Sequence, residues 1–255
     1  MSHQTKRLEH SVQGCDAQRK PHAVLDMASR RLKAMKIEQL LGLVDNHRPI
    51  RLLEVGTGSG GIAHYFGTLP DGRYSVDAVD IYDSRLVKDG YRYTQVEGTV
   101  LPFPDASFDV VLTNHVIEHV GERAAQLHHL EEVRRVLKQT GVAYLAVPNR
   151  WMLIEPHYRL AFLSWLPSKL RTPYLKWMDK GELYDCEPLQ MKQLERMLDE
   201  TGFKWKNLCL AAWRATLNIE HPDSFQARLV RQVPDFMLFP VKRIIPTLIY
   251  RMERG

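Results

Sequence analysis

A glycine-rich turn that directly follows an apolar run constrains this chain more than any other feature. The run RLLEV (residues 51–55) opens into Gly56, Gly58, Gly60 and Gly61, and the next residues, IAHYFGTL, have helical spacing. Glycines let the backbone approach a ligand closely, and the first turn of a helix presents free N–H groups. A strand, a glycine turn and a helix in this order predict a ligand site in an α/β protein.

The same alternation of strands and helices continues along the chain. SVDAVD (75–80) is a predicted strand that ends on Asp80, and FDVVLTN (108–114) has the continuous apolar pattern of a fully buried strand. A helix is expected from Glu122 to Lys138, with Gly141 just past its end, followed by the strand VAYLAVP (142–148). This order predicts a doubly wound, mostly parallel sheet with right-handed crossovers.

Composition and cysteine usage limit the class of protein. The 255 residues are 44% hydrophobic and 25% charged, as in an ordinary globular domain. Cys15, Cys186 and Cys209 lie far apart without a CxxC pair, which argues against a disulfide framework or zinc knuckle. The polar N-terminus lacks the apolar stretch of a signal peptide, and no run approaches the roughly 20 apolar residues that span a bilayer. We therefore expect a cytoplasmic protein.

The net charge of +5 is unevenly distributed. Residues 1–36 carry eight Lys or Arg against three acids, residues 149–180 carry six against two, and residues 221–255 carry six against three. An acidic middle with basic flanks indicates an anionic surface or substrate near the flanks, although solvated surface charge explains the pattern equally well. The basic residues are not gathered into one stripe with interleaved aromatics, so we expect no nucleic-acid partner.

Two acids near the glycine turn narrow the choice of ligand. Asp80 can accept hydrogen bonds from both hydroxyls of a ribose, and Gly56, Gly58 and Gly61 also satisfy the dinucleotide fingerprint G-x-G-x-x-G. Glu54 distinguishes a dinucleotide from another ligand that contains a ribose, because it lies within the strand, two residues before the first glycine. A carboxylate there suits a zwitterionic, cationic ligand better than a pyrophosphate.

Three stretches resemble one family in the correct order. LLEVGTGSGG (52–61) resembles the first motif of the Rossmann-like, class I S-adenosylmethionine-dependent methyltransferases. VEGTVLPFPDASFDVVLTNHVIEHV (96–120) is similar to the stretch shared by the ubiquinone-biosynthesis-type methyltransferases and other methyltransferase type 11 relatives. LKQTGVAYLAVPN (137–149) resembles the helix-to-strand segment that follows in that family.

The resemblance implies S-adenosylmethionine as cofactor and a role for each matching position. Its methionine moiety would lie along the turn, Asp80 would hold the ribose hydroxyls and Ile81 would pack on the adenine. Glu97, with Gly98 beside it, would meet the adenine amino group, although relatives commonly have Asp-Ala there. Asn114 and His115 would line the sulfonium end. The turn residues implied to contact the cofactor are Glu54, Gly56, Thr57, Gly58 and Gly60.

We divide the chain into six expected segments. Residues 1–22 form a flexible tail, 23–48 an N-terminal helix, and 49–148 the cofactor-binding α/β core. Residues 149–188, rich in tryptophan and proline without a clear period, form a helical and aromatic insertion or lid on the substrate side. Residues 189–216 hold the last helix and strand of the core, the strand within KWKNLCLAAW, and 217–255 form a basic amphipathic C-terminal segment.

Histidines supply the candidate catalytic residues. Transfer of a methyl group to oxygen or nitrogen often needs a base, and His119 and His157 are the candidates because histidine titrates near neutral pH. A structural role for His119 at a helix start is equally open. His115, Glu118 and His119 also match H-x-x-E-H, in which two histidines of one helix bind zinc. Because this motif follows a buried strand inside the methyltransferase stretch, we expect no metal.

The acceptor is the least defined part of the prediction. PNRWMLIEPHYRLAFLSWLP (148–167) resembles a subgroup of methyltransferases of glycan and cell-envelope biosynthesis, so we expect O-methylation of a saccharide or lipid-linked acceptor. The aromatic residues of the insertion could stack on a sugar or form the insertion's own core. A quinone or other small aromatic acceptor is the second hypothesis. A zinc hydrolase and a non-catalytic, cofactor-binding subunit are the remaining ones.

The last residues suggest a surface role. Apolar residues recur at roughly helical spacing through 224–255 with basic residues between them, and Pro234, Pro240 and Pro246 break the run into short pieces. Such pieces suit an interface with anionic lipid, so we expect this segment to hold the protein at the inner face of a membrane or to cover a lipid-like acceptor. Packing on the edge of the sheet or a dimer contact is equally open, and the sequence does not predict an oligomeric state.

Overall fold

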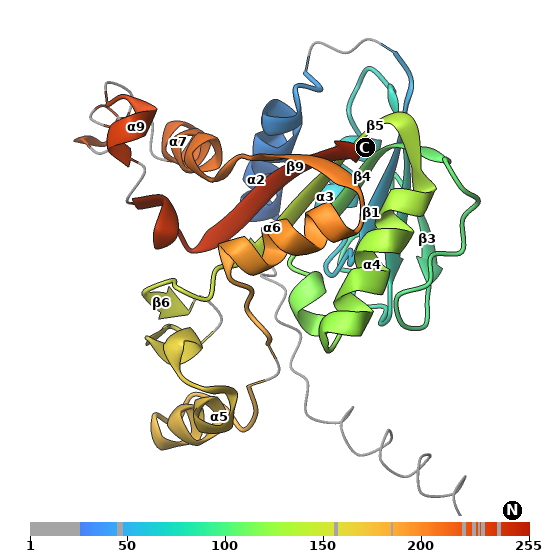
Figure 1. Cartoon of the computed structure of the whole chain (residues 1–255). Coiled ribbons are helices and arrows are strands. Elements are labelled where there is room, and N and C mark those ends of the chain that lie inside the picture. The colour runs from blue at the N-terminus through green and yellow to red at the C-terminus, as the bar shows by residue number, and fades with distance from the viewer. Residues whose placement is uncertain are drawn as a thin grey trace, which may run out of the picture.

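A seven-stranded sheet organises the chain (Figure 1). The computed structural model describes residues 26–44, 48–155, 158–184, 186–220, 223–225, 228, 230, 233–238 and 241–255. The strand order is β3-β2-β1-β4-β5-β9-β8, in which β3 to β5 run parallel and β9 runs antiparallel to both of its neighbours. The predicted doubly wound sheet is confirmed. Its strands are β1 Ile50–Val55, β2 Tyr74–Asp80, β3 Arg92–Gln95, β4 Phe108–Asn114, β5 Leu137–Pro148, β8 Phe203–Asn207 and β9 Thr247–Arg254.

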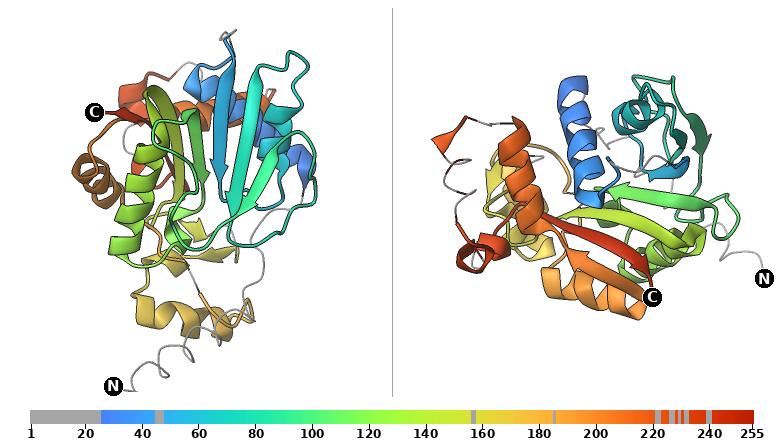
Figure 2. Two further views of the ribbon diagram at one scale, coloured as in Figure 1. Left: turned by 90° about the vertical axis from the view of Figure 1, so that its right-hand side faces the viewer. Right: turned by 90° about the horizontal axis from the view of Figure 1, so that it is seen from above.

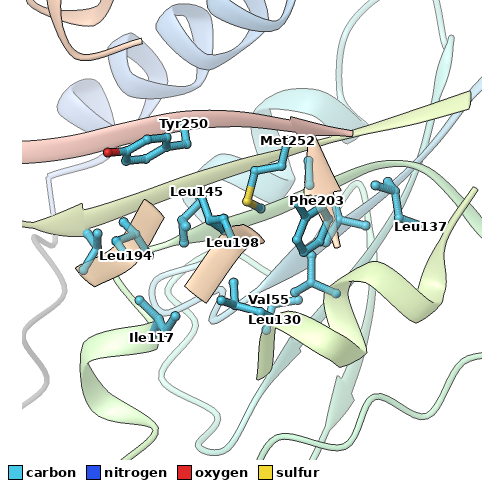
Figure 3. Packing of buried hydrophobic residues seen from close by; sticks show 14 of the residues in the cluster. Val55, Ile117, Leu130, Leu137, Leu145, Leu194, Leu198, Phe203, Tyr250 and Met252 are labelled. Carbon is cyan, nitrogen blue, oxygen red and sulfur yellow. The ribbon is translucent and has the colours of Figure 1, made fainter. Parts of the chain in front are cut away.

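Helices cover both faces of the sheet, which explains why its central strands read as continuous apolar runs. Helices α2 (Met27–Leu41), α3 (Gly61–Gly67) and α7 (Cys209–Glu220) lie on one face, and α4 (Arg123–Val136) and α6 (Met191–Glu200) lie on the other (Figures 1 and 2). On α6, Leu194, Met197 and Leu198 recur at helical spacing and are fully buried against β5 and β9 (Figure 3). The side chains of Leu145, Tyr250 and Met252 supply the facing surface.

Helix α2 begins and ends where its sequence directs. The Asp26 carboxylate accepts hydrogen bonds from the backbone N–H groups of Ala28 (3.0 Å) and Ser29 (3.3 Å), as an N-cap does. Gly42, with a φ of 68°, closes the C-terminal end in the left-handed conformation. Buried Ala34, Ile37 and Leu41 hold the helix on α3 and the sheet.

Residues 149–188, which we call the lid, form a small unit below the carboxyl ends of the parallel strands (Figure 1). It contains the hairpin β6 (Ile154–Glu155) and β7 (Leu160–Ala161), the short helix η3 (Leu163–Trp165), and α5 (Ser168–Trp177). A small core of Leu160, Leu163 and Leu175 lies within the lid. The insertion therefore lies at the edge where an open α/β sheet binds its ligands.

The strand expected within KWKNLCLAAW is confirmed as β8, whereas one expectation for the C-terminal third is wrong. The core does not end with that strand: helix α7 and strand β9 follow it, and β9 lies inside the segment expected to be amphipathic. In β9 the side chains of Leu248, Tyr250 and Met252 enter the cluster on one face of the sheet, and Ile249 enters the cluster on the other. Helical spacing and strand alternation overlap in this short apolar run, and pairing with β5 and β8 decided between them.

Smaller differences concern element ends and the tail. Helix α4 ends at Val136 and β5 begins directly at Leu137, so Gly141 lies within the strand rather than just past the helix. Between α7 and β9 the described residues include the short helices α9 (Asp235–Leu238) and η4 (Val241–Arg243). Within the described ranges, no helix combines the length and apolar character needed to cross a membrane.

Candidate active site

The turn after β1 depends on glycine. Gly56, Gly58 and Gly60 all adopt positive φ values, of 76°, 53° and 82°. A Cβ on Gly56 would collide with the Val116 side chain, and one on Gly60 would collide with the Tyr91 hydroxyl and the Val87 carbonyl. Both positions therefore require glycine for conformation and for space, and the turn exposes bare backbone at the start of α3.

Asp80, at the end of β2, holds this turn. Its Oδ2 accepts a hydrogen bond from the backbone N–H of Gly58 (2.8 Å), and its Oδ1 accepts one from the N–H of Ile81 (2.8 Å). Each carboxylate oxygen can still accept a further hydrogen bond. The Ile81 side chain is 39% exposed, which is unusual for isoleucine and leaves an apolar surface beside the carboxylate.

Glu54 is buried beneath the same turn. Its Oε2 accepts hydrogen bonds from the Thr57 hydroxyl (2.8 Å) and from the backbone N–H of Ala63 (3.0 Å) in the first turn of α3. Within the described part of the chain, its other oxygen, Oε1, accepts no hydrogen bond. Burial raises the pKa of Glu54 to about 8, against the two hydrogen bonds and the positive charge of Arg30, which lower it. A cationic ligand next to this carboxyl would favour its ionised form.

The segment after β4 brings three predicted residues to the same edge. Asn114 ends the strand, and His115 follows it with a φ of 60°, a left-handed conformation that is rare for a residue with a side chain. The His115 Nδ1 lies 3.2 Å from Glu118 Oε1. Glu118 is fully buried, and its Oε2 has no hydrogen-bond partner among the described residues. Such an oxygen normally meets a water molecule or a ligand.

His119 lies where this edge meets the lid. Residues Ile117–His119 form the short helix η2, and the His119 ring nitrogens lie 3.7 Å and 4.0 Å from the Cys186 sulfur. The backbone N–H of Glu187 donates a hydrogen bond to the Glu118 carbonyl (3.1 Å), so the end of the lid is tied to η2. These contacts fit a base facing the acceptor and equally fit a structural contact with the lid.

The remaining predicted residues are less closely placed. Glu97 and Gly98 are exposed, and they lie near the end of β2 because the backbone N–H of Val96 donates to the Asp80 carbonyl (3.0 Å). His157 lies outside the described residues. His129, on α4, is buried, with Nε2 2.9 Å from the Thr113 hydroxyl. Burial lowers the pKa of His129 to about 4, against the opposing effect of Glu118.

The geometry of the H-x-x-E-H residues does not match the zinc hypothesis. The H-x-x-E-H motif requires both histidines on one helix, whereas His115 lies before η2 in a left-handed conformation and His119 packs on Cys186. Across the residues that the structure describes, no group of three or more His, Cys, Asp or Glu side chains is arranged to hold a metal ion.

Three cations of α2 were missed from the sequence. Arg30, Lys33 and Lys36 recur every third residue, and Lys36 Nζ donates to the Thr216 hydroxyl of α7 (2.9 Å). Burial lowers the pKa of Lys33 to about 8, and Arg30 and Lys36 lower it further, while Glu220 and Glu118 raise it. Lys33 therefore lies within electrostatic reach of Glu118. The spacing was visible in ASRRLKAMK, but only the position of α2 in the fold shows what these cations face.

Comparison with known proteins decides the family. A family model described as "Methyltransferase domain" matches residues 53–145, which span the turn, Asp80 and the segment after β4. A Mycobacterium tuberculosis protein named a probable S-adenosylmethionine-dependent methyltransferase is 35% identical over 104 residues, 39% of this chain and 36% of that protein. The chain carries a class I S-adenosylmethionine-dependent methyltransferase domain.

Other relatives agree with this assignment over different lengths. The ubiquinone/menaquinone biosynthesis C-methyltransferase UbiE of Xanthomonas oryzae is 29% identical over 181 residues, 62% of this chain and 68% of UbiE. An uncharacterized Methanocaldococcus jannaschii protein, MJ1123, is 30% identical over 155 residues, which are 64% of its length. The chain thus spans less than two thirds of the first curated relatives that it matches.

Solved structures with low sequence identity support the methyltransferase-like fold alone. The [4+2]-cyclase SpnF superposes with a TM-score of 0.54 at 17% identity, covering 98% of this chain and 93% of SpnF. The CurJ carbon methyltransferase superposes with a TM-score of 0.52 at 18% identity, covering 89% of this chain and 54% of CurJ. A cyclase with this fold shows that the chemistry must be argued from the site.

The residues of the turn fit the methyltransferase cofactor, S-adenosylmethionine. Asp80 has free acceptor capacity for its ribose hydroxyls, and the positive φ values of Gly56, Gly58 and Gly60 shape the turn beside it. Glu54, with Oε1 unpartnered among the described residues, matches a ligand that carries an ammonium and a sulfonium group. The residues that would hold this cofactor lie at the carboxyl ends of β1, β2 and β4.

Proposed function

We propose that this chain transfers the methyl group of S-adenosylmethionine to a hydroxyl of an acceptor held between α2, η2 and the lid. The observation that carries the proposal is that the glycine turn after β1 lies beside a polar edge of the sheet and that the lid contacts this edge. Asn114, His115, Glu118 and His119 line that edge, and the contacts of Cys186 and Glu187 tie the lid to it. The bound cofactor supplies a methyl group on a positively charged sulfur.

The protein's own residues then have to position the acceptor and accept its proton. We propose His119 as the group that takes the hydroxyl proton, because it follows β4 and lies at the junction with the lid. The unpartnered Oε2 of Glu118 supports a second role, acceptance of a hydrogen bond from the acceptor molecule. Closure by the lid would hold both reactants in line and exclude water.

A saccharide or lipid-linked acceptor of the cell envelope is the substrate class that we propose first. The lid carries Trp151, Trp165 and Trp177 on its surface, a form of aromatic exposure suited to flat sugar faces and to lipid. A cytoplasmic location, with the site open to the inner face of a membrane, agrees with such an acceptor.

A quinone or other small aromatic acceptor is the second candidate. The observation that favours it is the match to UbiE, whose name assigns C-methylation in ubiquinone and menaquinone biosynthesis to that protein. The two candidates differ in the atom that is methylated. It is a hydroxyl oxygen in the first candidate and a carbon in the reaction that the name of UbiE gives.

Incubation of the purified chain with cell extract and cofactor labelled in the methyl group tests both candidates. Label in the glycan fraction or in polar lipids supports the first, and label in the quinone fraction supports the second. No label in any fraction, under conditions where the protein binds S-adenosylhomocysteine, would contradict catalysis and leave a non-catalytic subunit.

A further inference from the structure

The lid exposes an unusual amount of large apolar surface. Within the lid, nine large apolar residues are at least 38% exposed, from 38% for Trp165 to 79% for Trp177. Large apolar surfaces of this kind on a folded protein mark interaction sites. The nine are Trp151, Leu153, Ile154, Phe162, Trp165, Leu170, Trp177, Met178 and Leu183.

Three of these side chains, Trp151, Phe162 and Trp165, contact one another next to the hairpin of β6 and β7. The ring centroids of Trp151 and Trp165 lie 5.5 Å apart, and those of Phe162 and Trp165 lie 5.2 Å apart. The Trp165 indole N–H donates to the Met152 carbonyl (2.7 Å), and the backbone N–H of Phe162 donates to the Leu153 carbonyl (2.9 Å). The three rings are thus held in place while their outer sides remain exposed.

Phe162 itself is held outward at a conformational cost. Its φ of 58° lies in the left-handed region, which a residue with a side chain adopts only when its surroundings impose it. The result is a phenyl ring that is 52% exposed instead of buried in the lid. Backbone strain that keeps an aromatic ring in solvent points to a use for the ring.

Helix α5 carries further exposed apolar side chains, together with charge. Leu170 and Trp177 are seven residues apart, so they share one face of the helix, and they are 52% and 79% exposed. Lys169, Lys176 and Lys180 accompany them and are exposed. The lid does not need these residues for its own core, which consists of Leu160, Leu163 and Leu175 packed against tyrosines.

The mixture of exposed tryptophan, phenylalanine and lysine favours a membrane surface over a protein as the partner of the lid. Protein–protein interfaces are enriched in aromatics but depleted in lysine. Membrane interfaces combine tryptophan at the level of the headgroups with lysine and arginine facing anionic lipid. Across the described residues of the lid, the exposed charged side chains are four cations, Arg159, Lys169, Lys176 and Lys180, against three acids, Asp179, Glu182 and Glu187. Lys176 Nζ lies 3.0 Å from Glu182 Oε2, and three of the four cations lie on or next to α5.

We propose that the lid docks this protein on an anionic bilayer surface, with Trp151, Phe162, Trp165 and Trp177 entering the headgroup region. The lid also contacts His119 and Glu118 through Cys186 and Glu187, so docking would bring the bilayer next to the site of methyl transfer. That an acceptor is presented from this bilayer rests on the proposed function, whereas docking itself does not.

The proposed membrane contact therefore lies in the lid and not in residues 224–255, where the sequence suggested it. In that segment β9 is inside the sheet, and among its described residues the exposed large apolar ones are Phe225, Phe236, Met237 and Ile244. Phe236 and Met237, on α9, are 72% and 60% exposed and therefore offer a matched control outside the lid.

Vesicle flotation of the full chain tests the proposal. The intact chain should float at low salt with vesicles of phosphatidylcholine that contain phosphatidylglycerol, and much less with pure phosphatidylcholine. The double variant Phe162→Ser and Trp177→Ser should lower the bound fraction at least about tenfold, since each loses a large exposed apolar side chain. Replacing Lys169, Lys176 and Lys180 with Gln should weaken binding about fivefold per charge and reduce its salt dependence. The control variant Phe236→Ser and Met237→Ser should float like the intact chain.

Several results would overturn the proposal. These are an intact chain that never floats, a lid variant that floats like the intact chain, or a control variant that alone stays at the bottom. Light scattering that shows a dimer dissociated by the lid substitutions, without flotation of any form, would assign the surface to a second copy. Calorimetry with S-adenosylhomocysteine checks that every variant is folded. A chain that floats but never binds this product would contradict the proposed function and leave membrane docking intact.

Discussion

Individual residues carry the clearest physical statements, and Glu54 is the first. Its raised pKa means that the carboxyl keeps its proton at neutral pH until a cation approaches. The sign for stability follows: between pH 4.5 and about 8 the unfolded chain has released this proton and the folded chain has not, so this carboxyl makes the folded state less stable as pH rises through that range.

Binding of the cofactor should reverse this effect. If the ammonium and sulfonium groups favour the ionised Glu54, binding releases a proton and the affinity rises with pH up to about 8. Calorimetry in two buffers of different ionisation enthalpy measures that proton. Glu54→Gln should abolish the release and weaken binding by about 1–3 kcal/mol. Unchanged proton release in this variant would show that another group titrates.

His119 gives a second prediction at this scale. If it takes the acceptor's proton, His119→Ala lowers turnover by roughly 10²–10⁴-fold and leaves the affinity for S-adenosylhomocysteine almost unchanged. Cys186→Ala is the matched control, because it removes the contact with the lid and keeps the imidazole. An equal loss of turnover in both variants would make His119 a positioning residue of the lid.

At the scale of elements, α2 places a half-buried cation, Lys33, in the fold. Lys33 has a lowered pKa, so the folded chain loses its proton near pH 8 and the unfolded chain near 10.5. Stability should therefore rise as pH increases between these values. Lys33→Met should raise the free energy of unfolding at pH 7 by about 1 kcal/mol, since it removes a partly desolvated charge. Urea denaturation across this pH range measures both effects, and a destabilised variant would show that the charge is compensated.

Elements also show how far sequence reasoning reached. The order of β1, α3, β2, β4 and β5 could be predicted because each has either a buried apolar run or a glycine at its end. The final strand could not, because TLIYRMER satisfies helical and alternating patterns alike and its partners β5 and β8 are distant in sequence.

The candidate site divides in the same way. Glu54, Asp80 and the glycines could be found because the turn needs those residue types at fixed spacing. The strained backbone of His115, the unpartnered oxygen of Glu118 and the orientation of Lys33 depend on tertiary packing. The burial of His129, whose Nε2 meets the Thr113 hydroxyl, likewise depends on how α4 packs on β4.

At the scale of the whole molecule, the C-terminal segment is part of the core. A chain ending at Arg243 would lose β9, which would leave β8 without its partner strand and β5 with an unpaired edge. We expect this truncation to abolish the cooperative thermal unfolding transition, because β9 contributes four fully or nearly fully buried side chains to both faces of the sheet. Circular dichroism on heating measures it. A truncated chain with an unchanged transition would mean that β9 is dispensable.

The account as a whole depends on the ligand of the glycine turn, and calorimetry with S-adenosylhomocysteine and NAD tests it most directly. We predict binding of S-adenosylhomocysteine and no binding of NAD, because Glu54 places a carboxyl group beneath the turn at a position where a dinucleotide site has an apolar residue. Asp80→Ala should weaken this binding by about 1–3 kcal/mol through loss of the ribose contacts. Binding of NAD without any response to S-adenosylhomocysteine would contradict the methyltransferase assignment.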